Sequence, residues 1–189
     1  MEQPVIYFEN FLTEEDSEFL LKYIENNFKL TKDKYILYGK EVFSPRKTCF
    51  LSRNKDIKYT YSGQTKETFL YDNIINRLSK EIAVFLKVSQ NYFNGCLINL
   101  YKNGEDSISY HKDNELDMDK NTLIAVISLG AERNFCIKND KSGEVTKFKL
   151  SNGSLAVMNP ICQKEYKHAI LKEKKVKDKR LSLTFRNFK

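Results

Sequence analysis

Two histidines and one aspartate of this 189-residue chain have the residue types and spacing of a metal site. His111 and Asp113 stand in the segment His111-Lys112-Asp113, and alternate residues of a strand point to the same side, so both could reach one ion. His168, the only other histidine, lies further along in an apolar segment. Two imidazoles and a carboxylate on one face of iron leave positions open for a chelating oxo acid and dioxygen. The short H-x-D pattern is weak evidence alone, and a lone histidine is more often a core residue.

A segment near the end of the chain adds a second chemical feature. Its even-numbered positions are all polar, and on a strand they share one face: Arg180, Ser182, Thr184 and Arg186. Such a face needs either solvent or a polar ligand inside the fold. A planar guanidinium forms two parallel hydrogen bonds with a carboxylate, so Arg180 is suited to the distal carboxylate of 2-oxoglutarate. Together with the histidines, this segment indicates a site for Fe(II), 2-oxoglutarate and O2.

The elements that must position these residues begin with two helices. Thr13 is a typical N-cap, and apolar residues recur at helical spacing from Phe19 to Phe28. A second helix is predicted over Lys66–Val88, where one apolar stripe faces a charged side. Both helices precede most of the predicted strands.

The remainder of the sequence is typical of short strands separated by turns. A hairpin is predicted from Tyr35 to Leu51, turning at Gly39-Lys40. Six further strands are predicted: Cys96–Tyr101, Leu123–Leu129, Asn134–Lys138, Val145–Leu150, Ser154–Met158 and Arg180–Phe185. The lysine-rich stretch Lys172–Lys179 is expected to be an exposed loop between two strands. This order favours an α+β fold, a double-stranded β-helix or jelly roll, with N-terminal helices packed on one sheet.

Composition limits the classes of protein that the chain can represent. Hydrophobic residues make up 41% and the formal net charge is +7, which together favour a globular protein that can bind a polyanion. The four cysteines show no C-x-x-C spacing, so we expect them to be reduced and mostly buried. No apolar stretch approaches the roughly 20 residues of a membrane span. We therefore expect a soluble intracellular monomer, in the cytoplasm or nucleus.

The combined motifs resemble the AlkB dioxygenases, in particular the animal AlkB homologue that acts on duplex DNA. The similarity covers residues 45–188 and includes the metal triad and the Arg180 segment. Local matches are Ser44-Pro45-Arg46-Lys47, Tyr59-Thr60-Tyr61-Ser62-Gly63, Leu97-Ile98-Asn99-Leu100-Tyr101-Lys102-Asn103-Gly104, Asn152-Gly153-Ser154-Leu155 and Leu183-Thr184-Phe185-Arg186. The resemblance implies one domain over residues 1–189. Residues 1–90 would form the substrate-recognition hairpins and helices, and residues 91–189 the jelly-roll core.

The same resemblance implies roles for the residues around the metal. His111, Asp113 and His168 would bind Fe(II), with Arg186 beside Asp113 as a further catalytic residue. The 2-oxoglutarate contacts would come from Asn99, Tyr101, Arg180, Ser182, Thr184 and Arg186. Ser182 departs from the family, which usually has asparagine there. Because a hydroxyl is shorter than an amide, one polar contact to the keto-acid end is lost or made through water.

A further set of residues is assigned to the substrate by resemblance: Tyr38, Arg46, Tyr59, Tyr61, Asn114 and Glu115. Tyr61 would stack on a flipped base opposite His111, while Tyr59 and Glu115 would meet its exocyclic nitrogen. Tyr38, at the hairpin tip, would fill the gap that the flipped base leaves in a duplex, and nearby basic residues would hold phosphates. The alternatives are that the tyrosines pack on neighbouring strands and that Glu115 is a solvated acid.

The implied function is an oxidative demethylase that repairs N-alkylated bases, such as 1-methyladenine and 3-methylcytosine, in methylated DNA. RNA is a further candidate polymer, and duplex and single-stranded substrates both remain open. The reaction would release formaldehyde and succinate. One alternative is a 2-oxoglutarate oxygenase that hydroxylates or demethylates a protein or small molecule. The other is a non-catalytic jelly-roll binding module in which the histidines need not converge.

Overall fold

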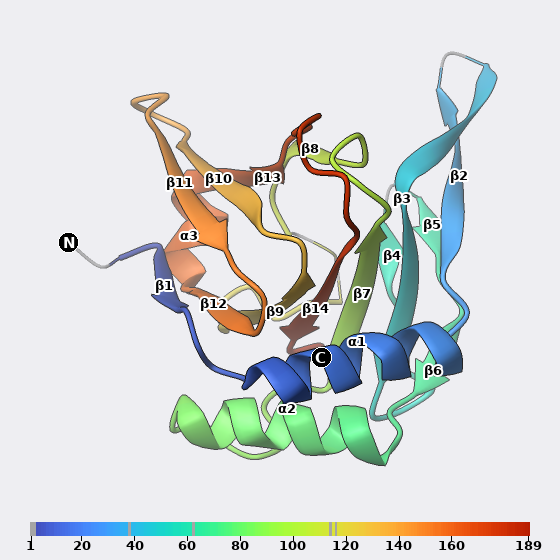
Figure 1. Ribbon diagram of the computed structural model, residues 1–189, viewed down its shortest axis with the longest axis vertical. Coiled ribbons are helices and arrows are strands. Elements are labelled where there is room, and N and C mark those ends of the chain that lie inside the picture. The colour runs from blue at the N-terminus through green and yellow to red at the C-terminus, as the bar shows by residue number, and fades with distance from the viewer. Residues whose placement is uncertain (1–2, 38, 62, 114, 116) are drawn as a thin grey trace.

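Two sheets of unequal size face each other in the computed structural model, which describes residues 3–37, 39–61, 63–113, 115 and 117–189 (Figure 1). Within these residues, the large sheet has the order β1 (Val5–Phe8), β12 (Ser154–Met158), β9 (Ile124–Gly130), β14 (Arg180–Arg186), β7 (Gly95–Tyr101), β3 (Lys40–Ser52) and β2 (Thr31–Leu37). A short strand, β6 (Thr68–Leu70), runs parallel to β3. The small sheet has the order β11 (Val145–Leu150), β10 (Arg133–Asn139), β13 (Tyr166–Ile170) and β8 (Ile108–His111). This is the predicted jelly roll.

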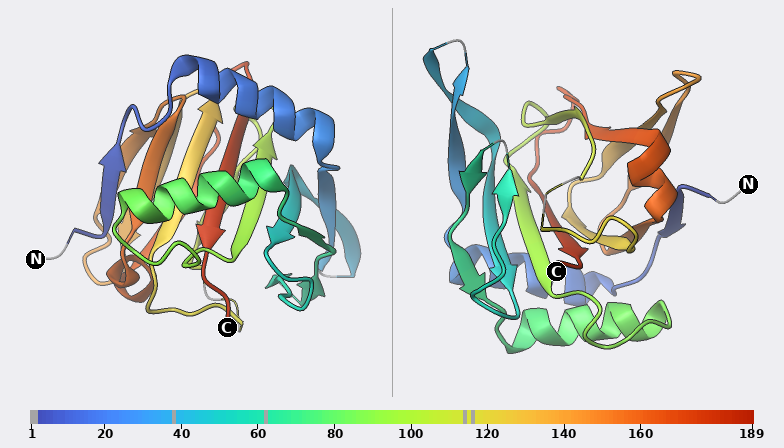
Figure 2. Two further views of the ribbon diagram at one scale, coloured as in Figure 1. Left: turned by 90° about the horizontal axis from the view of Figure 1, so that it is seen from below. Right: turned by 180° about the vertical axis from the view of Figure 1, so that it is seen from behind.

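Two helices cover the outer face of the large sheet, as predicted (Figure 2). Helix α1 (Glu14–Asn27) is capped by Thr13, whose hydroxyl accepts from the Asp16 amide at 3.1 Å. Helix α2 (Asn73–Phe85) is capped by Asp72. Each helix buries one apolar face against the sheet, and a fully buried leucine or isoleucine contributes roughly 1.5–3 kcal/mol. The buried residues include Leu20, Ile24, Ile75, Leu78 and Ile82.

The prediction of one helix over Lys66–Val88 was wrong at its beginning. Residues 68–70 are extended and pair with β3 as β6, and α2 begins only after the Asp72 cap. Thr68 and Phe69 are residues that strands favour, and an available strand edge outweighs weak helical propensity. The helix ends near Lys87, which has a φ of 57°.

Most predicted strands have the expected positions, and β11 and β12 have the predicted bounds. The additional elements are short or lie at edges: β1, β6, β13, the hairpin of β4 (Thr60–Tyr61) and β5 (Gln64–Thr65), and helix α3 (Pro160–Glu165). Four cysteines are free and buried, as expected. No helix in the described part of the chain is long and apolar enough to cross a membrane.

Strand β14 is central to the architecture because β9 and β7 pair with its two edges. All seven of its residues are buried. Leu181, Leu183 and Phe185 face the helices and join the core beneath them. Its polar residues face the opposite way, toward the cavity between the sheets. The strand therefore separates an apolar core from a polar chamber.

The lysine-rich segment forms a loop between β13 and β14, as predicted, and it docks against the loop after β7. The Gly104 amide donates to the Val176 carbonyl at 2.9 Å, and the Glu173 amide donates to the Gly104 carbonyl at 2.8 Å. A Cβ atom on Gly104 would lie 1.8 Å from the Glu173 carbonyl oxygen. Only glycine fits there without moving one of the loops.

Candidate metal centre

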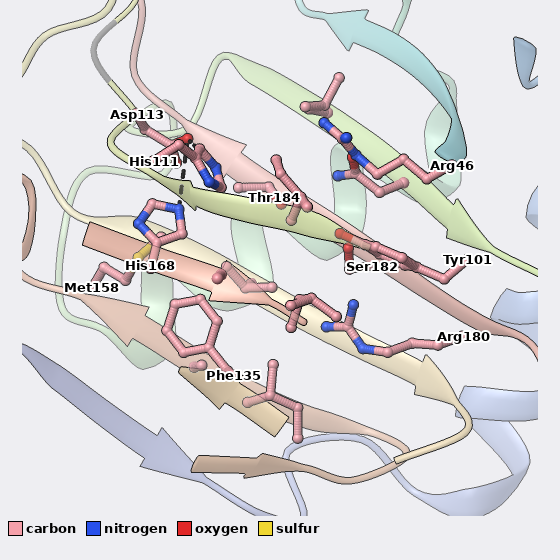
Figure 3. A pocket seen from close by; sticks show the side chains of 18 of the residues that line it. Arg46, Tyr101, His111, Asp113, Phe135, Met158, His168, Arg180, Ser182 and Thr184 are labelled. Atoms are coloured by element: carbon pink, nitrogen blue, oxygen red, sulfur yellow. Dashed lines mark hydrogen bonds and ion pairs between the residues drawn. The ribbon is translucent and has the colours of Figure 1, made fainter. Parts of the chain in front are cut away.

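Three potential metal ligands converge at one end of the cavity between the sheets (Figure 3). His111 and His168 are direct partners across β8 and β13. The oxygen Oδ1 of Asp113 lies 3.7 Å from His111 Nε2 and 3.8 Å from His168 Nε2. Donor atoms of the three residues lie within 4.8 Å of one another. The structure thus brings together the three side chains predicted from the sequence.

The reason given for that prediction was wrong for Asp113. Strand β8 ends at His111, so strand alternation does not direct the carboxylate toward the histidines. Asp113 lies in the loop after the strand and is only 2% exposed. Other contacts must therefore hold it in place.

Both histidines turn their Nε2 atoms toward the aspartate. The Nδ1–H of His111 donates to the Ser109 carbonyl at 2.8 Å, which leaves Nε2 as the unprotonated atom of the neutral ring. Burial lowers the pKa of His168 to about 3, and burial also lowers the pKa of His111. Neutral imidazoles with available lone pairs are the form that binds metal.

Arg186 holds the Asp113 carboxylate in its ionised form. Its Nη2 lies 2.9 Å from Asp113 Oδ1, and its Nη1 donates to Glu115 Oε1 at 3.2 Å. Burial alone would raise the pKa of Asp113, but the positive charge of the Arg186 guanidinium outweighs it and holds that pKa below its usual value. An anionic carboxylate between two neutral imidazoles is a suitable ligand set for a divalent metal.

The opposite end of the cavity contains a second buried guanidinium (Figure 3). Arg180 is 1% exposed, and its Nη2 donates to Ser128 Oγ at 2.8 Å. Within the described residues, its buried Nε and Nη1 have no hydrogen-bond partner. Burial lowers the pKa of Arg180 to about 10, so the group stays charged at neutral pH. A buried cation with unpaired N–H groups is suited to bind an anion, since leaving such donors unpaired is costly.

Comparisons with known proteins agree with this geometry. The family model described as the 2OG-Fe(II) oxygenase superfamily matches residues 4–186. The chain belongs to that superfamily. Within it, the chain is a member of the AlkB family: it is 26% identical over 96% of its length to "DNA oxidative demethylase ALKBH2" of Arabidopsis thaliana. It is 32% identical over 79% of its length to the bovine protein of the same name (Bos taurus). The chain spans 65% and 55% of the lengths of these two relatives.

A solved structure confirms the fold. The structure titled OsALKBH1 superposes with a TM-score of 0.67 and covers 99% of both chains, at 14% identity. At that identity the likeness supports the architecture alone. It supports the jelly roll with two covering helices as the architecture of this chain.

The cofactors of this superfamily are Fe(II), 2-oxoglutarate and O2, and the residues of this AlkB chain fit them. The triad supplies two nitrogen donors and one oxygen donor, the set that open iron sites use. The unpaired Arg180 N–H groups lie across the same cavity and can donate charge-assisted hydrogen bonds to a carboxylate. The two observations concern different ends of the cavity, so each tests the fit separately.

The other residues assigned to 2-oxoglutarate line the cavity between Arg180 and the triad: Asn99, Tyr101, Ser182, Thr184 and Arg186. Ser182 and Asn99 are direct partners across β14 and β7, which explains why they share the cavity face. The Tyr101 ring lies 5.4 Å from the Arg180 guanidinium carbon. Asn99 accepts a hydrogen bond from Arg46 Nε at 2.8 Å. Arg46, which the resemblance assigned to the substrate, therefore orients the amide of Asn99.

The residues assigned to the base have more varied positions. Tyr59 and Tyr61 both line the cavity and their rings stack 6.5 Å apart, but Tyr59 is only 3% exposed and packs against Phe50. Glu115 is buried and faces Arg186 rather than lining the cavity. Tyr38 and Asn114 lie outside the described residues.

Several residues that line the cavity or contact its side chains were not identified from the sequence. Phe135 lies beside His168 at a centroid distance of 5.5 Å, and Ser128 anchors Arg180. Gln163 hydrogen-bonds the backbone of Asp113. Phe135 could have been found by strand alternation in β10. Gln163 gave no signal, because its helix has only six residues.

Proposed function

We propose that this chain is an oxidative demethylase of N-methylated bases in nucleic acid, with 1-methyladenine and 3-methylcytosine in DNA as its first candidates. The observation that carries this proposal is one cavity whose lining combines the unpaired guanidinium of Arg180, a metal triad and two stacked tyrosines. The AlkB relatives named DNA oxidative demethylases support this choice of substrate. RNA carrying the same lesions is a further candidate.

The residues would divide the work along the cavity. Arg180 would bind the distal carboxylate of 2-oxoglutarate, and His111, Asp113 and His168 would hold the metal. Fe(II) with 2-oxoglutarate and O2 supplies, when bound, the oxidation that turns an N-methyl group into a hydroxymethyl group, which leaves as formaldehyde. Arg186 would keep Asp113 ionised and aligned while the cosubstrate is converted to succinate.

The tyrosine side of the cavity would receive the base. Tyr61 is partly exposed at the wall near His111, so a flipped base could stack on its ring. Arg46 lines the same cavity and places a buried positive charge in it. Flipping a paired base out of a duplex costs roughly a few kcal/mol. A methyl group on the pairing edge already weakens base pairing, so flipping the methylated base costs less. Selectivity for such lesions would follow in part from this lower cost.

The test is formaldehyde and succinate release from oligonucleotides carrying 1-methyladenine or 3-methylcytosine, single-stranded and duplex, with Fe(II) and 2-oxoglutarate. The matched control is His168→Ala, which should release neither product. If the parent protein converts 2-oxoglutarate but releases no formaldehyde from any methylated oligonucleotide, the alternative of a protein or small-molecule substrate replaces this proposal.

A further inference from the structure

The backbone of Asp113 is held by a side chain from a distant segment. Asp113 follows the end of β8, so no sheet ladder fixes its peptide group. Its amide N–H instead donates to Gln163 Oε1 at 2.8 Å, in a buried hydrogen bond. Buried hydrogen bonds are costly to leave unmade, so this contact constrains the loop.

The orientation of the Gln163 amide is set on both sides. Gln163 is 9% exposed, and its Nε2 faces Met158 Sδ at 3.6 Å, where a sulfur can only accept. Its oxygen must therefore face the Asp113 N–H. The side chain is long enough to connect α3 to the loop after β8.

Gln163 and Arg186 restrain Asp113 in different ways. Arg186 contacts the carboxylate, whereas Gln163 contacts the main chain. Helix α3 leads directly into β13, which carries His168. The Gln163 contact therefore couples the loop of one proposed ligand to the segment that delivers another.

We infer that Gln163 is a positioning residue for the metal centre: it fixes the Asp113 backbone so that the carboxylate stays within reach of both histidines. This inference rests on the proposed role of Asp113 as a metal ligand. Gln163 itself touches neither a metal nor a substrate. Partners that orient metal ligands typically change metal affinity by roughly 10- to 100-fold when removed.

The experiment measures Mn(II) affinity without nucleic acid or 2-oxoglutarate, by the electron paramagnetic resonance signal of free Mn(II). Gln163→Leu removes the acceptor at similar volume and should raise the Kd for Mn(II) by roughly 10- to 100-fold. The matched control is Ser79→Ala in α2, far from the site, where Ser79 Oγ accepts a part-buried hydrogen bond from Arg53. It should lower the melting temperature and leave the Kd for Mn(II) unchanged.

A second variant distinguishes loss of the Asp113 contact from misfolding. Gln163→Asn keeps an amide, but its oxygen is one methylene too short for the Asp113 N–H, so the Kd should rise as in Gln163→Leu. A lower melting temperature with an unchanged Kd in either folded variant would show a merely structural role and overturn the inference. If the parent protein does not bind Mn(II), the metal assignment fails as well. Demethylation failing while these affinities differ as expected would overturn only the proposed substrate.

Discussion

The Arg180 end of the cavity and the β2–β3 hairpin are built in contrasting ways. Arg180, Ser182 and Thr184 lie on β14, which has a paired strand on each edge and no exposed residue. The hairpin lies at the sheet edge, where β2 pairs only with β3 in the described residues. Ile36 is 73% exposed and Phe43 is 56% exposed. Packing fixes the Arg180 end of the cavity, whereas the outer end of the hairpin, including residues 40–43 of β3, is exposed.

This difference suggests how the two regions share the work. Side chains on a buried central strand keep one geometry, which suits the binding of a cofactor of constant shape. A hairpin with exposed apolar residues has little packing to lose when it contacts a partner. Substitutions at the Arg180 end of the cavity should therefore affect every reaction of the protein. Substitutions at the outer end of the hairpin should affect the reaction on particular substrates only.

The largest effect is expected at the metal ligands. Replacing His111, Asp113 or His168 by alanine should abolish 2-oxoglutarate decarboxylation on every substrate, because each removes one of three ligands. The fold should remain, as judged by circular dichroism, since the larger apolar core lies between the large sheet and the two helices. Near-normal decarboxylation by His168→Ala would contradict the assignment.

Arg180→Ala should have the next largest effect. A buried carboxylate that loses its charged partner costs about 2–5 kcal/mol, which raises the 2-oxoglutarate concentration for half-maximal activity roughly 30- to 5,000-fold. Arg180→Lys should restore only part of the affinity because lysine cannot form the fork. Arg77 is exposed, and Arg77→Ala serves as the control. It should leave the 2-oxoglutarate concentration for half-maximal activity unchanged. An unchanged requirement in Arg180→Ala would remove this residue from the cosubstrate site.

The hairpin should show an effect that depends on the substrate. Tyr38→Ala removes the proposed aromatic wedge, and loss of one stacking contact costs roughly 1–3 kcal/mol. Activity on a methylated duplex should therefore fall, while activity on the same lesion in a single strand stays near that of the parent. Phe19→Ala, which removes an exposed aromatic side chain from α1, is the control. Equal losses on both substrates with a lower melting temperature would instead indicate packing.

The smallest effect is expected for the rate at which the buried cysteine thiols react. Burial raises the pKa of Cys49 to about 11 and that of Cys162 to about 12, so neither forms appreciable thiolate at neutral pH. A chromogenic disulfide reagent should react slowly with native protein and with all four thiols after denaturation. Rapid labelling of native Cys162 would show that α3 opens. The jelly roll around the cavity would then be less rigid than its buried packing indicates.

The sequence was sufficient for the elements whose signal is local. Periodicity located α1, which buries one face, while the flanking turns Ser142-Gly143 and Asn152-Gly153 located β11 and β12. It failed at β6, where pairing with β3 decides the conformation of Thr68–Leu70. Such pairing depends on residues far away in the chain, which no local pattern contains.

The candidate site also contains some residues with a local signal in the sequence and others whose positions depend on distant contacts. The triad and Arg180 could be identified because their residue types carry the chemistry. Asp113 was expected on a strand, but its position depends on Gln163 and Arg186, which come from separate elements. The contact between Arg46 and Asn99 was also unpredictable, because it joins residues assigned to different ligands. Contacts between elements are fixed by the fold as a whole.

The docking of Gly104 against Glu173 has a practical consequence for protein engineering. A reporter or affinity tag inserted at the Asn103-Gly104 turn would separate two loops that hydrogen-bond each other directly. The turn at Gly143 offers the opposite case, since a Cβ atom there would meet nothing within 4 Å. Exposed turns with such free space are the positions that tolerate insertions. Fluorescent labels for following substrate binding therefore belong between β10 and β11.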